Sequence, residues 1–274
     1  MAESTEKKGL LGSFLSLSND NPKKTLFVAV MLCLVCSILV STAAVSLKPL
    51  QTSNKKTDIK RNILAVTGLS DQGGDVDELF SQFDVRLVDL SSGQYADTDI
   101  DPVSYDQRKA AGDPQMSVKL TAEQNTAGIG RRANLAPVYL LTEGDTVKQV
   151  VLPVHGYGLW STLYGFLSLE GDFNTIKGLR FYEHAETPGL GGEVDNPKWR
   201  AQWEGKQVFD ENGNVKIQVI RGHVDSHTAE AEFKVDGLSG ATLTSKGVTN
   251  LVQYWLGDHG FGPYLKNMHS ELGK

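Results

Sequence analysis

The chain has 274 residues, a net charge of −6 and a hydrophobic content of 40%. The length allows one large domain or two small ones with a real core, and the hydrophobic content excludes a polytopic membrane protein. The acidic balance argues against nucleic acid as a partner, because phosphate binding needs a basic face.

An uncharged apolar run lies near the start of the chain. Residues 25–47, TLFVAVMLCLVCSILVSTAAVSL, are long enough to cross a bilayer as one helix. The 24 residues before this run favour a retained membrane anchor over a cleaved signal peptide. Cys33 and Cys36, the only cysteines of the chain, lie in the run, and we interpret them as small hydrophobic residues of a lipid-facing helix. The rest of the chain therefore has no disulfide framework and no cysteine-ligated metal or iron–sulfur site.

The predicted organisation has four parts. Residues 1–24 form an N-terminal segment, 25–47 a transmembrane helix, 48–57 a linker and 58–274 one soluble domain. The linker, KPLQTSNKKT, is predicted from its proline and its polar residues. Lysines flank the apolar run on both sides, so charge alone does not set the orientation of the anchor.

The soluble domain opens with helical patterns and continues with strands. Residues 58–66 and 76–83 have helical spacing, and VRLVDL at 85–90 predicts a strand before a polar segment that runs to about residue 134. Four further β-rich runs follow, at 137–143, 148–156, 161–170 and 175–186. These runs predict the main sheet of the domain.

The last third of the chain mixes short elements with one clear helix. We expect a helix over 196–205 and strands over 215–220 and 229–235. The final helix is predicted to begin at an N-cap on Thr244 or Ser245 and to end at Gly257. Its apolar face repeats at helical spacing through Val248, Leu251, Val252, Trp255 and Leu256. The predicted fold class is α+β: a single N-terminal transmembrane helix, then an antiparallel sheet with flanking helices.

The segment DGLSGATLTS, residues 236–245, crowds hydroxyl groups before that helix, and three interpretations are open. One is an ordinary glycine turn with a helix cap. A second is a G-x-S-x-A nucleophile elbow built on Ser239, although four residues separate this serine from the predicted helix and only Asp258, His259, His269 and Glu271 follow as triad partners. The third is an anion site at the helix start, where a threonine hydroxyl beside a phosphate can be esterified to it.

A family resemblance separates these interpretations. The string DGLSGAT resembles the D-x-x-[ST]-G-A-T motif at which FMN is attached to threonine through its phosphate. Together with HGYGLWSTLYGF (155–166) and HAETPGLGGEVDNPKW (184–199), it makes the chain similar to the C-subunit family of Na⁺-translocating NADH:quinone oxidoreductases. The G subunit of the Rnf electron-transport complex shares the flavin motif, but it is usually shorter, and the extra region at about 70–135 favours the first family.

The resemblance assigns a role to each residue of the motif. Thr242 is the FMN-bearing position, and Thr244 is the alternative attachment site. The loop around the phosphate is shaped by Ser239, Gly240 and Ala241. Asp236 is expected to be part of what a Mg-dependent flavin transferase recognises when it uses FAD as donor.

The isoalloxazine ring would need a mostly apolar slot with a few backbone donors and acceptors. Two segments are expected to supply it, through Tyr157, Trp160, Glu186, Thr187, Gly189, Leu190 and Gly191. His184 and Glu186 are expected to alternate on a strand and to point the same way. His223 and His227 have H-x-x-x-H spacing, and we interpret them as surface residues, so no metal site is predicted.

The resemblance implies an electron-carrying subunit, with FMN as its one cofactor and no catalytic residue of its own. It places the soluble domain in the periplasm, the N-terminus in the cytoplasm and the anchor in the cell inner membrane. The implied partners are the other subunits of a complex that couples NADH oxidation by ubiquinone to Na⁺ export. Three alternatives stay open: a G-type Rnf subunit, a membrane-anchored serine hydrolase using Ser239, and a binding module without a cofactor.

Overall fold

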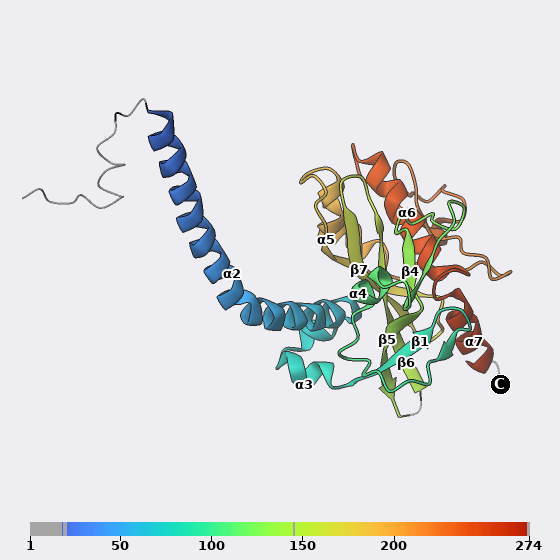
Figure 1. Cartoon of the computed structure of the whole chain (residues 1–274). Coiled ribbons are helices and arrows are strands. Elements are labelled where there is room, and N and C mark those ends of the chain that lie inside the picture. The colour runs from blue at the N-terminus through green and yellow to red at the C-terminus, as the bar shows by residue number, and fades with distance from the viewer. Residues whose placement is uncertain (1–17, 19–20, 145, 273–274) are drawn as a thin grey trace, which may run out of the picture. The chain divides into compact units, whose positions relative to one another are not determined.

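The computed structural model describes residues 18, 21–144 and 146–272 of the chain, and the side chains of all of these except Gln72 and Leu272. It contains two compact units, Met1–Lys56 and Thr57–Lys274 (Figure 1). Most of the predicted N-terminal segment, at residues 1–17, 19 and 20, lies outside the described residues.

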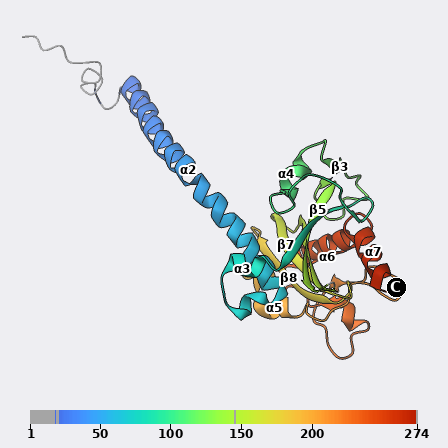
Figure 2. The same cartoon turned by 90° about the horizontal axis from the view of Figure 1, so that it is seen from below.

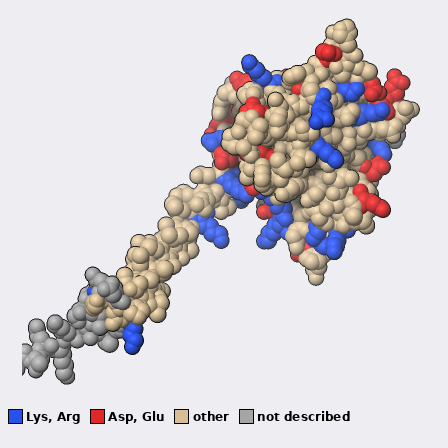
Figure 3. Space-filling view, turned by 90° about the horizontal axis from the view of Figure 1, so that it is seen from above, with Lys and Arg blue, Asp and Glu red and all other residues tan. Residues whose placement is uncertain are grey.

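The long helix α2, Pro22–Thr67, contains the predicted anchor. Among the described residues it is the one helix long and apolar enough to cross a membrane, and none of its most apolar window is buried. Figure 3 shows this stretch in tan, with lysine and arginine side chains at its two ends. Cys33 and Cys36 are exposed on it, as expected for residues that would face lipid.

The linker expected at 48–57 is wrong in its conformation, because these residues continue α2. Pro49 lies inside the helix, where it removes one backbone hydrogen bond, but residues 50–57 contain neither glycine nor proline to end it. The helix predicted over 58–66 is confirmed as the last part of α2. It belongs to the second unit, where Ile63, Leu64 and Val66 are buried.

A six-stranded antiparallel sheet forms the centre of the second unit. Its spatial order is β2-β1-β5-β6-β7-β8, and each neighbouring pair is antiparallel. The strands are β1 Phe83–Asp89, β2 Gln94–Tyr95, β5 Leu135–Glu143, β6 Thr146–Tyr157, β7 Thr162–Glu170 and β8 Ile176–Glu183. The predicted α+β class is therefore confirmed, and the four β-rich runs form β5 to β8.

Two hydrophobic cores cover the two faces of this sheet. Figure 2 shows α6 and α7 on one side of the strands and α3 on the other. Alternation along β6 places Val150, Leu152 and Val154 in the larger core and Val151 in the smaller one. The larger core includes the apolar face of α6, Thr242–Leu256, which packs on β6. The smaller core includes the last turns of α2 and helix α3, Val76–Phe80.

Short elements complete the second unit. They are η1 Leu69–Gln72, α4 Gln107–Gly112, β3 Ser117–Lys119, β4 Arg131–Ala133, η2 Gly191–Asp195, α5 Pro197–Ala201, β9 Gln218–Val219, η3 Ala231–Phe233, β10 Lys234–Val235 and α7 Gly262–Leu272. Strands β9 and β10 form a small parallel pair, and β3 and β4 an antiparallel one.

Several predicted boundaries are wrong. The helix predicted over 76–83 ends at Phe80, because Phe83 already belongs to β1. The helix predicted over 196–205 is α5, which ends at Ala201. The strand predicted over 215–220 is reduced to β9. The strand predicted over 229–235 is reduced to β10, and residues 231–233 form the 3-10 helix η3, because Glu230 takes a left-handed conformation that interrupts an extended chain.

Candidate functional site at the start of helix α6

The loop of residues 236–241 leads directly into α6, and Thr242 is its first helical residue. Ala241 occupies the N-cap position and makes no side-chain capping bond, so the N-cap predicted on Thr244 or Ser245 is wrong. Both side chains point inward instead. The Ser245 hydroxyl accepts a hydrogen bond from the Leu238 amide at 3.0 Å, which closes the loop onto the helix.

The four hydroxyl groups of residues 236–245 differ in their exposure, and that of Ser245 is buried. Thr242 and Ser239 are exposed, whereas Thr244 is completely buried. Thr242 therefore presents its hydroxyl at a helix start whose first amides lack intrahelical partners and carry a positive partial charge. No acidic residue lies in the first turn of α6 to neutralise that charge.

The carboxylate of Glu186 connects three segments beneath this helix start. Its Oε1 accepts hydrogen bonds from the amides of Leu159, Trp160 and Ser161 at 3.1, 3.0 and 3.2 Å. Its Oε2 accepts one from the Thr244 hydroxyl at 2.7 Å. Burial raises the pKa of Glu186, but these hydrogen bonds outweigh it, so that the pKa lies below its ordinary value.

The strand on which His184 and Glu186 were expected to alternate ends at Glu183, so that prediction is wrong. The two side chains have separate partners, since His184 Nε2 lies 2.9 Å from Asp195 Oδ2. After Glu183 the chain leaves the sheet, and the Glu186 carboxylate reaches the amides of residues 159–161. The carbonyl of Thr187 then closes the following turn by accepting the amides of Leu190 and Gly192.

Glycines allow the three segments to approach each other closely. A Cβ atom at Gly191 would lie 2.6 Å from Thr244 Oγ1 and 2.7 Å from Glu186 Oε2. A Cβ at Gly158 would lie 2.7 Å from Glu186 Oε1, and one at Gly247 would lie 2.6 Å from the carbonyl oxygen of Tyr157. The site therefore has a compact base, made of the 157–161 loop, the 186–192 loop and α6.

Large apolar side chains are exposed on the segments that meet at this base. Trp160 is 66% exposed, Leu243 59%, Tyr157 50% and Leu190 43%. Leu243 directly follows Thr242, and Leu190 Cδ2 lies 2.8 Å from where a Cβ of Gly240 would be. Exposed apolar groups beside an exposed hydroxyl fit a planar aromatic ligand anchored at that hydroxyl. The expected cofactor residues thus gather in one place, except that Glu186 uses its carboxylate on the protein itself.

Asp236 holds the opposite side of the loop. Its Oδ1 accepts the Val224 amide at 2.7 Å, and its Oδ2 contacts His223 Nδ1 at 2.9 Å and Gln202 Nε2 at 3.1 Å. Burial raises the pKa of Asp236, but these partners together lower it below its ordinary value. Asp236 therefore remains charged and orders the 222–224 segment against the loop.

The geometry does not fit a hydrolase built on Ser239. Within the described residues, the Ser239 hydroxyl makes no hydrogen bond to a histidine, and His223 is already paired with Asp236. His259 contacts Tyr254 beyond the far end of α6, about 20 Å along a helix of 15 residues. Among all the residues that the structure describes, no group of three His, Cys, Asp or Glu side chains is placed to hold a metal ion.

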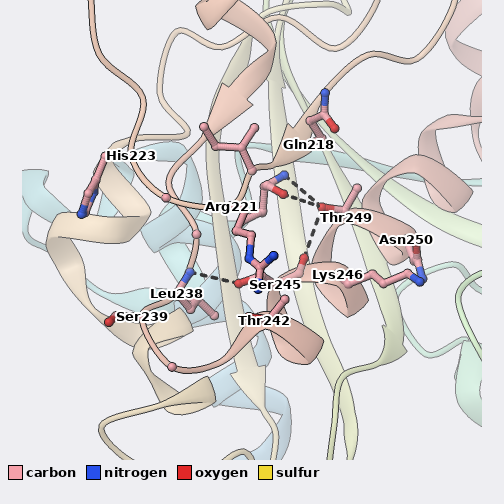
Figure 4. A pocket seen from close by; sticks show the side chains of 15 residues that line it. Gln218, Arg221, His223, Leu238, Ser239, Thr242, Ser245, Lys246, Thr249 and Asn250 are labelled. Carbon is pink, nitrogen blue, oxygen red and sulfur yellow. Dashed lines mark hydrogen bonds between the residues drawn. The ribbon is translucent and has the colours of Figure 1, made fainter. Parts of the chain in front are cut away.

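A cavity of about 580 Å³ lies on the other side of Thr242, between α6 and the 218–223 segment (Figure 4). Arg221 and Lys246 line it, and neither is among the residues predicted from the sequence. Lys246 could have been identified from the sequence as a neighbour of Thr242, because it follows Thr242 by about one helical turn. Arg221 lies 21 residues before Thr242, and no local pattern connects the two.

Comparisons with known proteins agree on this region. A protein-family model described as FMN-binding domain matches residues 158–257, from the glycine loop over Glu186 to the end of α6. Among solved structures, the crystal structure of Shewanella oneidensis NqrC is similar, with a TM-score of 0.72 and 33% identity, and the match covers 80% of this chain and 99% of that one.

Curated relatives extend the similarity to most of the chain. The C subunit of the Na(+)-translocating NADH-quinone reductase of Pseudomonas aeruginosa is 50% identical over 255 residues, which cover 92% of this chain and 97% of the relative. The protein of the same name from Vibrio vulnificus is 53% identical over 249 residues, which cover 90% of this chain and 96% of the relative.

Proposed function

The chain belongs to the family of Na(+)-translocating NADH-quinone reductase C subunits, and on this premise we propose that it carries FMN as a phosphate ester on Thr242. The match to the FMN-binding domain supports FMN as the cofactor, and the covalent bond to Thr242 goes beyond that match. The observation that carries it is the exposed hydroxyl of Thr242 in the SGAT loop, at an uncapped helix start and beside exposed apolar side chains.

The difference between Thr242 and Thr244 supports this choice of residue. Esterification needs a hydroxyl that a transferase can reach, and Thr244 is completely buried with its hydroxyl donated to Glu186. An ester at Thr244 would remove that donor and force a phosphate into a space closed by Gly191. In the proposed attachment, a bond forms between Thr242 Oγ1 and the flavin-side phosphorus of FAD while the phosphoanhydride breaks, so that AMP leaves and the hydroxyl loses its proton.

When bound, FMN supplies one-electron transfer chemistry. The residues of this chain hold and orient it. The first amides of α6 would hold the phosphate, and Trp160, Leu190 and Leu243 would offer apolar contacts to the ring. Glu186 fixes the two loops that carry Trp160 and Leu190 against α6. Tyr157, Thr187 and Gly189, on the same two loops, are also exposed.

We further propose the cellular arrangement. The apolar part of α2 spans the cell inner membrane, the N-terminus is cytoplasmic and the second unit is periplasmic. The domain then passes electrons between other subunits of a complex that oxidises NADH, reduces ubiquinone and exports Na⁺. The membrane anchor keeps the domain at a high effective concentration near those partners. The match to relatives that are C subunits of the reductase extends over 90% of the chain and favours this role over a G-type Rnf subunit.

Maturation requires a partner, which we propose is a Mg-dependent flavin transferase that recognises Asp236. Because Asp236 also orders residues 222–224, its substitution would disturb the loop as well as the recognition. Recognition and folding can be separated by comparing Asp236→Asn, which keeps the shape and part of the hydrogen bonding, with Asp236→Ala.

The proposal is tested by co-expressing the full chain with such a transferase and recording flavin fluorescence in a denaturing gel. The wild-type chain should give a fluorescent band, and Thr242→Val should give none. Thr244→Val should keep the band. A band that persists in Thr242→Val and disappears in Thr244→Val would move the attachment to Thr244, and a wild-type chain without a band would refute covalent attachment.

A further inference from the structure

A buried arginine connects strand β4 with the turn that joins α6 to α7. Arg132 is 8% exposed, and its guanidinium makes one hydrogen bond, from Nη1 to the carbonyl oxygen of His259 at 2.5 Å. Arg131, the preceding residue of β4, lies on the other face of the strand and bonds to Ser117. The alternation of the strand therefore places the charge of Arg132 inside the fold.

No described carboxylate pairs with this charge. Among the residues that the structure describes, Arg132 forms no ion pair, and its Nε is buried without a hydrogen-bond partner. The charge of Arg132 helps to lower the pKa of Asp89, but hydrogen bonding from the Ser91 hydroxyl is the largest cause of that shift, and it ends on Asp89 Oδ1. A guanidinium keeps its charge when it is buried, so an unpaired one is costly unless an anion accompanies it.

The hydroxyl of Tyr254 is a second buried donor near Arg132. Tyr254 is 4% exposed, and its Oη has no partner within the described part of the chain. Both side chains contact His259, Arg132 through the backbone carbonyl and Tyr254 through the imidazole, with 6.4 Å between the two ring centroids. Burial raises the pKa of Tyr254 to about 12, although the charge of Arg132 acts against it, so the hydroxyl keeps its proton and can donate it to an acceptor.

The turn between α6 and α7 holds these groups in place. The Phe261 amide donates to the Trp255 carbonyl at 2.5 Å. A Cβ at Gly260 would lie 2.2 Å from the same carbonyl oxygen, so the turn packs closely against the end of α6. Because Tyr254 lies at that end of the helix, its ring and the His259 carbonyl belong to one compact piece of backbone.

We propose that Arg132 and Tyr254 bind a small monovalent anion, with chloride as the simplest candidate, between β4 and the end of α6. The anion accepts hydrogen bonds from Arg132 Nε and Tyr254 Oη, and its charge neutralises the guanidinium. Phosphate and sulfate fit less well, because their four oxygens need more donors than these two. The site lies at the opposite end of α6 from Thr242, so it does not depend on the proposed flavin attachment.

The test exchanges the anion at constant ionic strength, so that the screening of exposed charges does not change. The full chain is purified in detergent in sodium gluconate, and its melting temperature is recorded as chloride replaces gluconate. The wild type should gain about 3 °C or more at saturating chloride, because a ligand that binds only the folded state stabilises it. Arg132→Met should lose this gain, and Tyr254→Phe should reduce it.

A matched control separates the site from general effects of the salt exchange. Arg86→Gln removes a partly exposed arginine that pairs with Asp84, and this variant should keep the full chloride gain. If Arg132→Met does not fold, the comparison of Tyr254→Phe with the wild type decides, because it removes only one buried oxygen. A chloride gain that is undiminished in Tyr254→Phe and in every folded Arg132 variant would overturn the proposal.

Bromide locates the site directly, because it has the charge of chloride and scatters anomalously. Crystals of the full chain grown in sodium bromide should show an anomalous peak within hydrogen-bond distance of Arg132 Nε and Tyr254 Oη. A water at this position without an anomalous peak would overturn the proposal, and so would equal melting temperatures of the wild type in chloride and in gluconate. None of these outcomes bears on flavin attachment, which the denaturing gel tests separately.

Discussion

The hydroxyl of Thr244 donates a hydrogen bond to Oε2 of Glu186 across 2.7 Å, although 58 residues separate the two in the sequence. Both residues are buried, and Oε1 of the same carboxylate accepts three backbone amides of the 159–161 loop. This contact divides the threonines of the motif into two roles. Thr244 helps to hold the site together, and Thr242 remains exposed for attachment.

Replacing Thr244 by valine tests the structural role of its hydroxyl. Valine keeps the volume but leaves Glu186 Oε2 without its donor, so we expect the free energy of unfolding to fall by about 1–3 kcal/mol. Flavin attachment in the presence of a transferase should persist. Chemical denaturation of Thr244→Val and Thr244→Ser measures this, with serine as the control that keeps the hydroxyl. Equal stability of the valine variant and the wild type would contradict the role assigned to Thr244.

The pH dependence of stability reports on the Glu186 carboxylate. Its pKa is lower in the folded state than in the unfolded state, where it lies near 4.5. The stabilisation is therefore complete above the unfolded-state pKa and is lost as the pH falls through the folded-state pKa. Glu186→Gln lacks this titration, so the stability difference between the wild type and the variant should shrink below about pH 4.5. A difference that stays constant with pH would show that the charge of Glu186 is not stabilising.

Gly191 tests the close approach at the base of the site. A Cβ there would lie 2.6 Å from Thr244 Oγ1 and 2.7 Å from Glu186 Oε2, so Gly191→Ala must displace one of them. We expect a loss of about 1–3 kcal/mol in the free energy of unfolding. Gly112→Ala is the matched control, because a Cβ at Gly112 meets nothing within 4 Å and its φ is not positive. The same melting temperature for both variants would argue against the tight base.

Trp160 tests where the ring lies. The side chain is 66% exposed, so Trp160→Ala should change stability little, while it removes an aromatic surface from the proposed ring site. We expect the flavin fluorescence of the folded, loaded chain to increase, because an indole next to the ring quenches its emission. After denaturation, the wild type and the variant should fluoresce equally. Val103→Ala, at an exposed apolar residue outside the site, serves as control. An unchanged folded-state fluorescence in Trp160→Ala would place the ring elsewhere.

The sequence was sufficient for the parts of the fold that depend on local patterns. The alternation of β5 to β8 and the apolar face of α6 are visible in neighbouring residues, and so is the position of Thr242 within SGAT. The strand predicted at 229–235 is wrong because Glu230 adopts a left-handed backbone conformation, which cannot be predicted from a glutamate in the sequence. The helical conformation of residues 48–57 was not expected, because Pro49 and the polar residues after it are more typical of a turn.

The candidate site could be located from its motif but not assembled from it. Glu186 was assigned to the cofactor because it stands in the ETPGLG segment, yet its partners come from two other segments that only the folded chain brings together. Arg221 was missed for the same reason, since its connection to Thr242 runs through the contact of the 220–222 segment with Gly237. Long-range contacts of this kind leave no periodic signal in the sequence.

Peptide mass mapping of the mature chain from its native membrane is the most direct test of the central claim. Proteolysis should yield a peptide containing residues 236–245 that is heavier by one phosphate-linked FMN, and fragmentation should place the added mass on Thr242. The same peptide at the mass of the bare polypeptide, or with the added mass on Thr244, would contradict the account.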